Sequence, residues 1–113
     1  SLGLAKLPRV KLCGQIVGVE GYVESAAMGI LAGMFVAGQL ASKPIEPPPE
    51  TTALGALYAH VRRGNPDRRF EPMNVHFGLL PETGARGKKA RRRAAVDRAV
   101  ADFGPWLDRI REI

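Results

Sequence analysis

The feature that most restricts the fold is an uncharged stretch over residues 26–41, followed by a proline-rich stretch over residues 43–50. The uncharged stretch contains mostly good helix formers and is apolar on nearly every side, so we expect a buried helix over about residues 21–41. It is shorter than the roughly 20 apolar residues that a membrane span requires. Proline lacks the backbone donor and clashes with the preceding helical turn, so the second stretch predicts an extended connector. A long helix covered on more than one side is therefore expected to lead into a non-helical segment.

The residues before this helix predict a strand that runs into a glycine-punctuated turn. A brief apolar alternation over residues 10–13 ends at Gly14, and Gly18 and Gly21 follow it. Such glycines leave backbone amides uncovered where a helix N-terminus carries a partial positive charge, so the turn could bind an anionic group. The spacing G-x-x-x-G-x-x-G is not the dinucleotide fingerprint, and on spacing alone a structural turn is the preferred interpretation.

Small residues recur every four positions within the long helix, at Gly29, Gly33 and Ala37. This stripe predicts that a neighbouring element packs closely against it. Glu20 and Glu24 lie at the start of the helix, where they would complement the helix dipole as readily as take part in chemistry.

Two further helices are predicted downstream. Thr51 or Thr52 can cap a helix over Ala53–Arg63, which ends at Gly64 and the residues after it. Its apolar face consists of Leu54, Leu57, Tyr58 and Val61. Residues 70–81 have prolines near both ends and predict an extended, partly buried loop.

The last helix is expected from about Gly87, with a possible kink or division at Pro105. Its predicted core-facing stripe consists of Val96, Val100, Phe103, Leu107 and Ile110.

The composition limits the chain to one small domain or part of one, because it has 113 residues and a mass of 12.2 kDa. With 45% hydrophobic and 25% charged residues, it resembles an ordinary globular protein. The single cysteine, Cys13, excludes a disulfide framework and suits a reducing compartment, so the cytoplasm is the expected location. His60 and His76 lack the partner ligands that a metal site needs, so no metal is predicted.

The net charge of +6 is concentrated at the start of the last helix. The basic cluster consists of Arg86, Lys88, Lys89, Arg91, Arg92 and Arg93. Such a run is usually a solvated face, but cations are unfavourable at a helix N-terminus, so fold stability explains the cluster poorly. Contact with RNA phosphates is the preferred interpretation, and it would position an RNA rather than select a base.

Three separated motifs together resemble a known family. They are GQIVGVEGYVESAA at residues 14–27 with GILAG at 29–33, ETTALGAL at 50–57 and FEPMNVHFGLLP at 70–81. In this order they are similar to the C-terminal part of the folate- and FAD-dependent tRNA (uracil-5-)-methyltransferases, the TrmFO family. The tail after Gly87 is similar only in its basic, helical character.

The resemblance implies an α/β fold, in which this chain is the C-terminal fragment of a Rossmann-like FAD-binding domain: a terminal strand, a long buried helix and further helices, mostly helical within the chain. Residues 1–85 would be the C-terminal segment of that domain, and residues 86–113 its basic helical tail. The rest of the FAD-binding domain and an insertion domain would lie upstream in the same polypeptide. The family transfers the methylene of methylenetetrahydrofolate to C5 of a T-loop uridine in tRNA and reduces it with FADH2, and NAD(P)H restores the flavin.

The resemblance also assigns roles to residues. The turn and helix start would close the flavin site, and the cofactor-binding residues would be Gly14, Gln15, Gly18, Val19, Glu20, Gly21, Tyr22 and Val23. Tyr22 could stack near the flavin or the folate, or equally pack on the core. The family's functional cysteines would lie upstream, so Cys13 is expected to be a buried strand residue, and His76 a hydrogen-bonded structural residue rather than part of the pocket.

The isolated chain is accordingly expected to be inactive. Two alternatives stay open: a noncatalytic basic RNA-binding module derived from such an enzyme, and a structural subunit that completes a split enzyme in trans.

Overall fold

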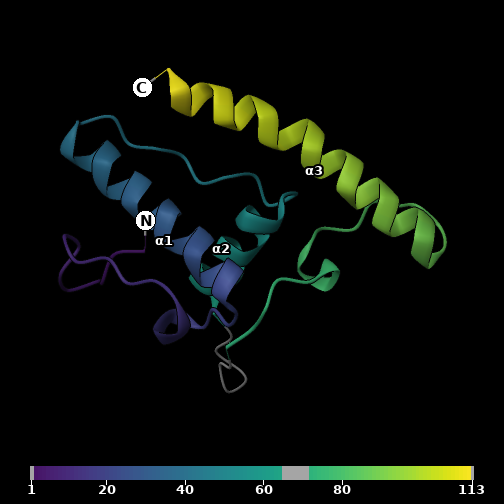
Figure 1. Cartoon of the computed structure of the whole chain (residues 1–113), viewed down its shortest axis with the longest axis horizontal. Coiled ribbons are helices and arrows are strands. Elements are labelled where there is room, and N and C mark those ends of the chain that lie inside the picture. Colours follow the sequence, from purple (N-terminus) through teal and green to yellow (C-terminus); the bar gives the residue numbers. More distant parts are fainter. Residues whose placement is uncertain (1, 65–71, 113) are drawn as a thin grey trace.

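The computed structural model describes residues 2–64 and 72–112, and it is mostly helical (Figure 1). Three α-helices and two short 3-10 turns follow one another along the chain. Their order is η1 (Gln15–Val17), α1 (Tyr22–Leu40), α2 (Ala53–Arg63), η2 (Phe77–Leu79) and α3 (Lys88–Arg111). The two predicted helices α1 and α2 are confirmed, with bounds within one residue of those expected.

The strand predicted over residues 10–13 is absent from the described part of the chain. The backbone there forms one isolated antiparallel bridge, between Gly3 and Lys11, and Leu12 donates to the Leu2 carbonyl at 3.1 Å. A strand needs neighbouring strands to satisfy its backbone groups, and two short segments do not supply a sheet. The predicted terminal strand is therefore not found among the described residues, whereas the expectation that this chain is mostly helical is confirmed. The α/β fold of a larger FAD-binding domain stays a prediction. Cys13, expected to be buried in that strand, is exposed.

Helix α1 buries one face, not several. The buried residues are Met28, Leu31, Ala32, Phe35 and Gly38. On the other side Tyr22, Ile30 and Leu40 are exposed, so the expectation of a helix covered on more than one side is wrong for the described residues. By length and composition α1 could cross a membrane, but a soluble core helix meets the same criteria, and 28% of its apolar window is buried.

The small-residue stripe of α1 contacts no neighbour in the part of the chain described. A Cβ added at Gly29 or Gly33 would meet no atom within 4 Å, so the predicted close packing is not found there. The close approach occurs one turn later, where a Cβ at Gly38 would lie 2.7 Å from the carbonyl oxygen of Lys43. The connector folds back over the end of α1 at this glycine.

Helix α2 begins as the sequence predicts. The Thr52 hydroxyl accepts from the Gly55 amide at 3.1 Å and donates to the Pro49 carbonyl at 2.6 Å, which ties the helix start to the connector. α2 packs on α1 through Leu57 and Tyr58, and the Tyr58 ring lies 5.5 Å from that of Phe35. Its predicted apolar face is confirmed.

Helix α3 continues through Pro105 without division. Proline at this position removes the hydrogen bond to the carbonyl of Ala101, which is exposed, so water can replace the missing donor. Helix α3 buries one residue in each half, Ala95 and Trp106. In the second half, the indole nitrogen of Trp106 donates to the Glu46 carbonyl at 2.9 Å.

The predicted stripe of α3 is therefore partly wrong. Phe103, Leu107 and Ile110 pack against the core as expected. Val96 and Val100, in contrast, are 47% and 72% exposed. Both side chains lie outside the core cluster.

The molecule is flat and open for its length. Its radius of gyration is 14.9 Å, and its extents are 44 × 39 × 24 Å. A compact domain of this size has a radius of about 13 Å. Figure 1 shows the reason: α3 runs along one side, the connector passes between it and α1, and α1 and α2 cross on the other side. The open architecture leaves two surfaces accessible, the turn before α1 and the first half of α3.

Candidate functional site

The turn before α1 is shaped by three glycines with positive φ angles. The φ values of Gly14, Gly18 and Gly21 are 83°, 94° and 101°, a backbone conformation that residues with a side chain rarely adopt. Between them, Val19 is fully buried and anchors the turn in the core. The N-cap of α1 is Gly21, and it provides no side-chain hydrogen bond to the first-turn amides. The helix start therefore combines a glycine of positive φ with first-turn backbone amides that no capping side chain satisfies.

A segment far along the chain holds this turn in place. Val19 and Met73 form an isolated parallel bridge, in which the Glu20 amide donates to the Met73 carbonyl at 3.1 Å. The Met73 amide donates in return to the Gly18 carbonyl at 3.0 Å. Asn74 adds a side-chain hydrogen bond from its amide to the Glu20 carbonyl at 3.0 Å. The first and third sequence motifs thus meet at the helix start.

Five of the eight predicted cofactor residues surround one hollow beside this turn. It has a volume of about 270 Å³ and is lined by Gln15, Val19, Glu20, Gly21, Tyr22 and Ser25. Gly14 and Gly18 shape the same turn without lining the hollow, and Val23 is exposed on the first turn of α1. The structure brings the predicted residues together in space, but it does not test their role.

The residues present fit a flavin as one wall of its site. The hollow is below the roughly 300–1,000 Å³ of a complete small-molecule pocket, so further residues would have to enclose the ligand. Tyr22, which is 98% exposed, offers a free ring at the edge of the hollow. The first-turn amides favour negative charge, whereas Glu20 and Glu24 oppose it. Glu24 is engaged by Asn74, whose amide lies 3.4 Å from Oε1, so it mainly supports the turn.

The two histidines, His60 and His76, lie in different surroundings. His76 accepts from the Gly78 amide at 3.0 Å through Nδ1, and its Nε2 lies 3.3 Å from the Met73 sulfur. His76 is hydrogen-bonded as expected, and its structural role stays a prediction. His60 is half-buried in the last turn of α2. No group of three or more metal-ligating side chains is found in residues 2–64 and 72–112.

The basic cluster forms a second candidate surface. All six predicted residues are exposed, and Lys88 to Arg93 occupy the first turns of α3 after the N-cap Gly87. Among the described residues, Arg93 is the member that forms an ion pair, with Asp97. Arg92 lies over the Phe77 ring, 5.3 Å from its centroid. The rest of the cluster presents its charge to solvent and could accept phosphates.

Sequence reasoning missed three residues that organise these surfaces. Asn74 clamps the glycine turn, and the Arg98 guanidinium donates to the carbonyls of Glu82 and Pro81 at 3.1 and 2.5 Å. Phe77 packs under Arg92. Periodicity could not have identified them, because Asn74 and Glu20 are 54 residues apart and their contact depends on tertiary structure.

Two comparisons with known proteins find sequences that are similar to this chain. Residues 1–44 match the family model described as glucose inhibited division protein A. The curated relatives are named methylenetetrahydrofolate--tRNA-(uracil-5-)-methyltransferase TrmFO. The chain is 49% identical to that of Cereibacter sphaeroides over 104 residues, which is 88% of this chain and 23% of the relative. It is 50% identical to that of Syntrophotalea carbinolica over 111 residues, which is 96% of this chain and 24% of the relative.

The relative from Paracoccus denitrificans is 47% identical over 111 residues, 94% of this chain and 25% of its own length. These matches confirm the resemblance to the TrmFO family that the three motifs indicated. The chain spans about a quarter of the length of the curated relatives it matches.

Proposed function

We propose that the chain is part of an enzyme that methylates C5 of a T-loop uridine in tRNA, using methylenetetrahydrofolate and reduced FAD, which NAD(P)H regenerates. The observation that carries the proposal is the identity of 47–50% to proteins named TrmFO over most of this chain. Residues 1–85 would form the C-terminal segment of the FAD-binding domain, and residues 86–113 its basic tail. A cytoplasmic location stays a prediction.

In this proposal the turn before α1 closes one side of the flavin site. Gln15, Gly21 and Tyr22 line its hollow, and the uncapped amides at the helix start would stabilise negative charge on the ligand. Reduction of the transferred one-carbon group is the chemistry that a bound flavin would supply. The residues of this chain would bind and orient, since the described lining of the hollow contains neither a cysteine nor a histidine.

The basic cluster would hold tRNA phosphates. Its support is geometric, because the cluster projects from the half of α3 that extends away from the core. Phosphate contacts of this kind position an RNA without selecting a base. The slope of log affinity against log salt would increase in proportion to the number of phosphates that the cluster neutralises.

The test uses the full-length native protein that carries these residues. Lys89→Gln with Arg91→Gln should lower kcat/KM for tRNA methylation and reduce the slope of log affinity against log salt by about two. The matched control is Arg109→Gln with Arg111→Gln, at the other end of α3, which should leave the slope unchanged. Equal effects of the two pairs would contradict a local phosphate site.

The bound-flavin spectrum of the same protein tests the enzyme assignment itself. Stoichiometric FAD and methyl transfer to tRNA are expected. RNA binding by a protein without flavin would instead support the noncatalytic RNA-binding module.

A further inference from the structure

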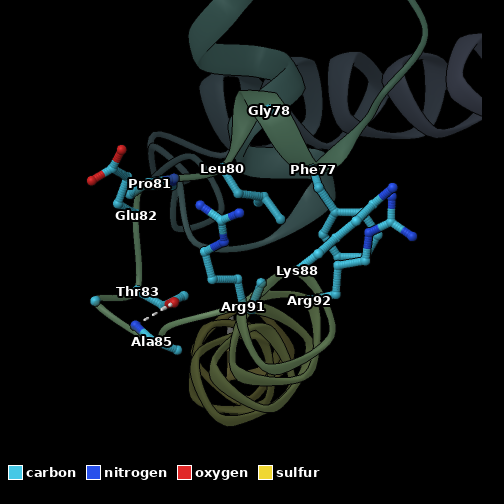
Figure 2. A pocket seen from close by; sticks show the side chains of 12 residues that line it. Phe77, Gly78, Leu80, Pro81, Glu82, Thr83, Ala85, Lys88, Arg91 and Arg92 are labelled. Atoms are coloured by element: carbon cyan, nitrogen blue, oxygen red, sulfur yellow. Dashed lines mark hydrogen bonds between the residues drawn. The ribbon is translucent and has the colours of Figure 1, made fainter.

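Two neighbouring hollows lie between the loop around η2 and α3. Figure 2 shows the residues that line the more basic of the two. One, of about 570 Å³, is lined by the cations Lys88, Arg91 and Arg92. The other, of about 650 Å³, is lined mainly by apolar side chains, including Phe77, Val96 and Val100. Both hollows are lined by Phe77, Gly78, Leu80, Arg92 and Ala95. An apolar groove therefore adjoins a basic one.

Two side chains that do not line the cleft, Arg98 and Trp106, hold its walls in place through hydrogen bonds. Arg98 donates to the Pro81 and Glu82 carbonyls, which fixes the loop against α3. Trp106 attaches the second half of α3 to the connector through its bond to the Glu46 carbonyl. The cleft is thus a formed surface, and it shares no lining residue with the hollow beside Gly21.

The apolar groove is open to solvent. Val100 is 72% exposed, and the Phe77 ring is 46% exposed beneath Arg92. Figure 2 shows Phe77 and Leu80 on the loop side, facing Lys88, Arg91 and Arg92 on α3. A ligand that fits must therefore combine a flat apolar part with negative charge close to it.

We propose that this cleft binds an unpaired nucleotide of an RNA, with the base in the apolar groove and the adjoining phosphate on Lys88 and Arg91. Bases stack on aromatic rings and guanidinium planes whatever their sequence, and Phe77 and Arg92 offer both. An apolar protein segment would fit the groove less well, because it would leave the cations at its edge without counter-charges. The inference rests on the proposed RNA-binding function and adds to it a preference for unpaired over paired RNA.

The test compares two RNAs on the full-length native protein. One is a short stem-loop with the fluorescent base 2-aminopurine at an unpaired loop position, and the other is a fully paired duplex of the same length. The informative variant is Val100→Gln, which places a larger polar group in the groove on an exposed helix position. The matched control is Ala101→Gln, an exposed neighbour that does not line the groove.

The stem-loop should bind the unaltered protein more tightly than the duplex does, with a change in 2-aminopurine fluorescence. Val100→Gln should weaken stem-loop binding roughly tenfold and leave duplex binding and its salt slope unchanged. Phe77→Ala should have the same selective effect, whereas Ala101→Gln should have none.

Equal binding of both RNAs, or equal weakening of both by Val100→Gln, would overturn the cleft proposal and leave the phosphate-binding surface standing. Failure of either RNA to bind would overturn both. The cleft proposal would also be overturned if 2-aminopurine fluorescence did not change on stem-loop binding while Val100→Gln lowered the melting temperature of the protein. That result would show that another part of the protein covers the groove.

Discussion

The side-chain amide of Asn74 donates to the Glu20 carbonyl at 3.0 Å, which joins two segments that are 54 residues apart at the start of α1. The same pair of segments exchanges two backbone hydrogen bonds, from Glu20 to Met73 and from Met73 to Gly18. The glycine turn is therefore not a free loop but one half of a small two-stranded contact. Its shape depends on the loop that contains the third sequence motif.

Asn74→Asp should loosen this contact, because the carboxylate cannot donate and adds negative charge beside Glu24. An exposed hydrogen bond of this kind contributes about 0.5–1.5 kcal/mol, which corresponds to roughly a twofold to tenfold change in local opening. Hydrogen exchange in the full-length protein should show this acceleration at the amides of Glu20 and Met73. Asn74→Ala should give a smaller effect. If the two amides exchange at the original rate in Asn74→Asp, the side chain does not hold the turn.

Gly21→Ala should distort the helix start. Its φ of 101° is unfavourable for alanine, and the added Cβ would lie 2.6 Å from the Asn74 amide nitrogen. A strained backbone of this kind costs about 1–3 kcal/mol. The thermal midpoint and the flavin content of the full-length protein should both fall.

Gly104→Ala is the matched control for that substitution. Gly104 lies inside α3, where an added Cβ meets no atom within 4 Å, and alanine favours helix by about 1 kcal/mol. It should leave flavin content unchanged and raise the midpoint slightly. A similar loss of flavin in both variants would argue against a specific role for the turn.

Gly55→Ala should destabilise the start of α2 despite the higher helix propensity of alanine. The added Cβ would overlap the carbonyls of Pro49 and Pro48, which lie against the helix. Overpacking against a rigid backbone costs about 1–3 kcal/mol, more than the propensity gain. Thermal unfolding measures the difference, with Ala53→Gly at an exposed position of the same turn as the control for propensity alone. A midpoint that rises in Gly55→Ala would contradict the close contact.

Trp106→Ala should detach α3 from the rest of the fold. Trp106 is 3% exposed, packs at 5.3 Å from Phe103 and bonds the Glu46 carbonyl, and truncation of a buried tryptophan costs about 3–5 kcal/mol. We expect increased protease cleavage within α3 in addition to a lower midpoint. Val100→Ala removes an exposed side chain from the same helix. It should leave protease cleavage unchanged and change the free energy of unfolding by no more than about 0.5 kcal/mol. Unchanged cleavage in Trp106→Ala would show that α3 is held by other contacts.

Local signals in the sequence were sufficient for the helices. The bounds of α1 and α2, the Thr52 cap and the extended connector follow from helix propensity, capping chemistry and proline geometry. The helical tail and its basic first turns also follow from the residues alone. These properties depend on neighbours within one helical turn, so no tertiary information is needed.

Tertiary structure decided which faces are buried. Val96 and Val100 share the period of Phe103 and Leu107, yet only the second pair packs on the core cluster. Trp106 attaches the second half of α3 to the connector, whereas the first half contacts the loop around η2 through Arg98. The strand predicted at residues 10–13 has the right alternation but no sheet to join within the described residues. Burial and strand pairing require a partner surface, and a local pattern does not specify where that partner lies.

The candidate site divides in the same way. The residues alone located the glycine turn and the basic cluster, because both are local concentrations of one chemical property. The clamp of Asn74 on Glu20, the Arg98 contacts to the loop carbonyls and the cleft between η2 and α3 arise from segments far apart in the chain. The sequence by itself determined the helices and the charge of this protein, whereas the tertiary structure decided which side chains meet, because contact between distant segments depends on the packing of the whole chain.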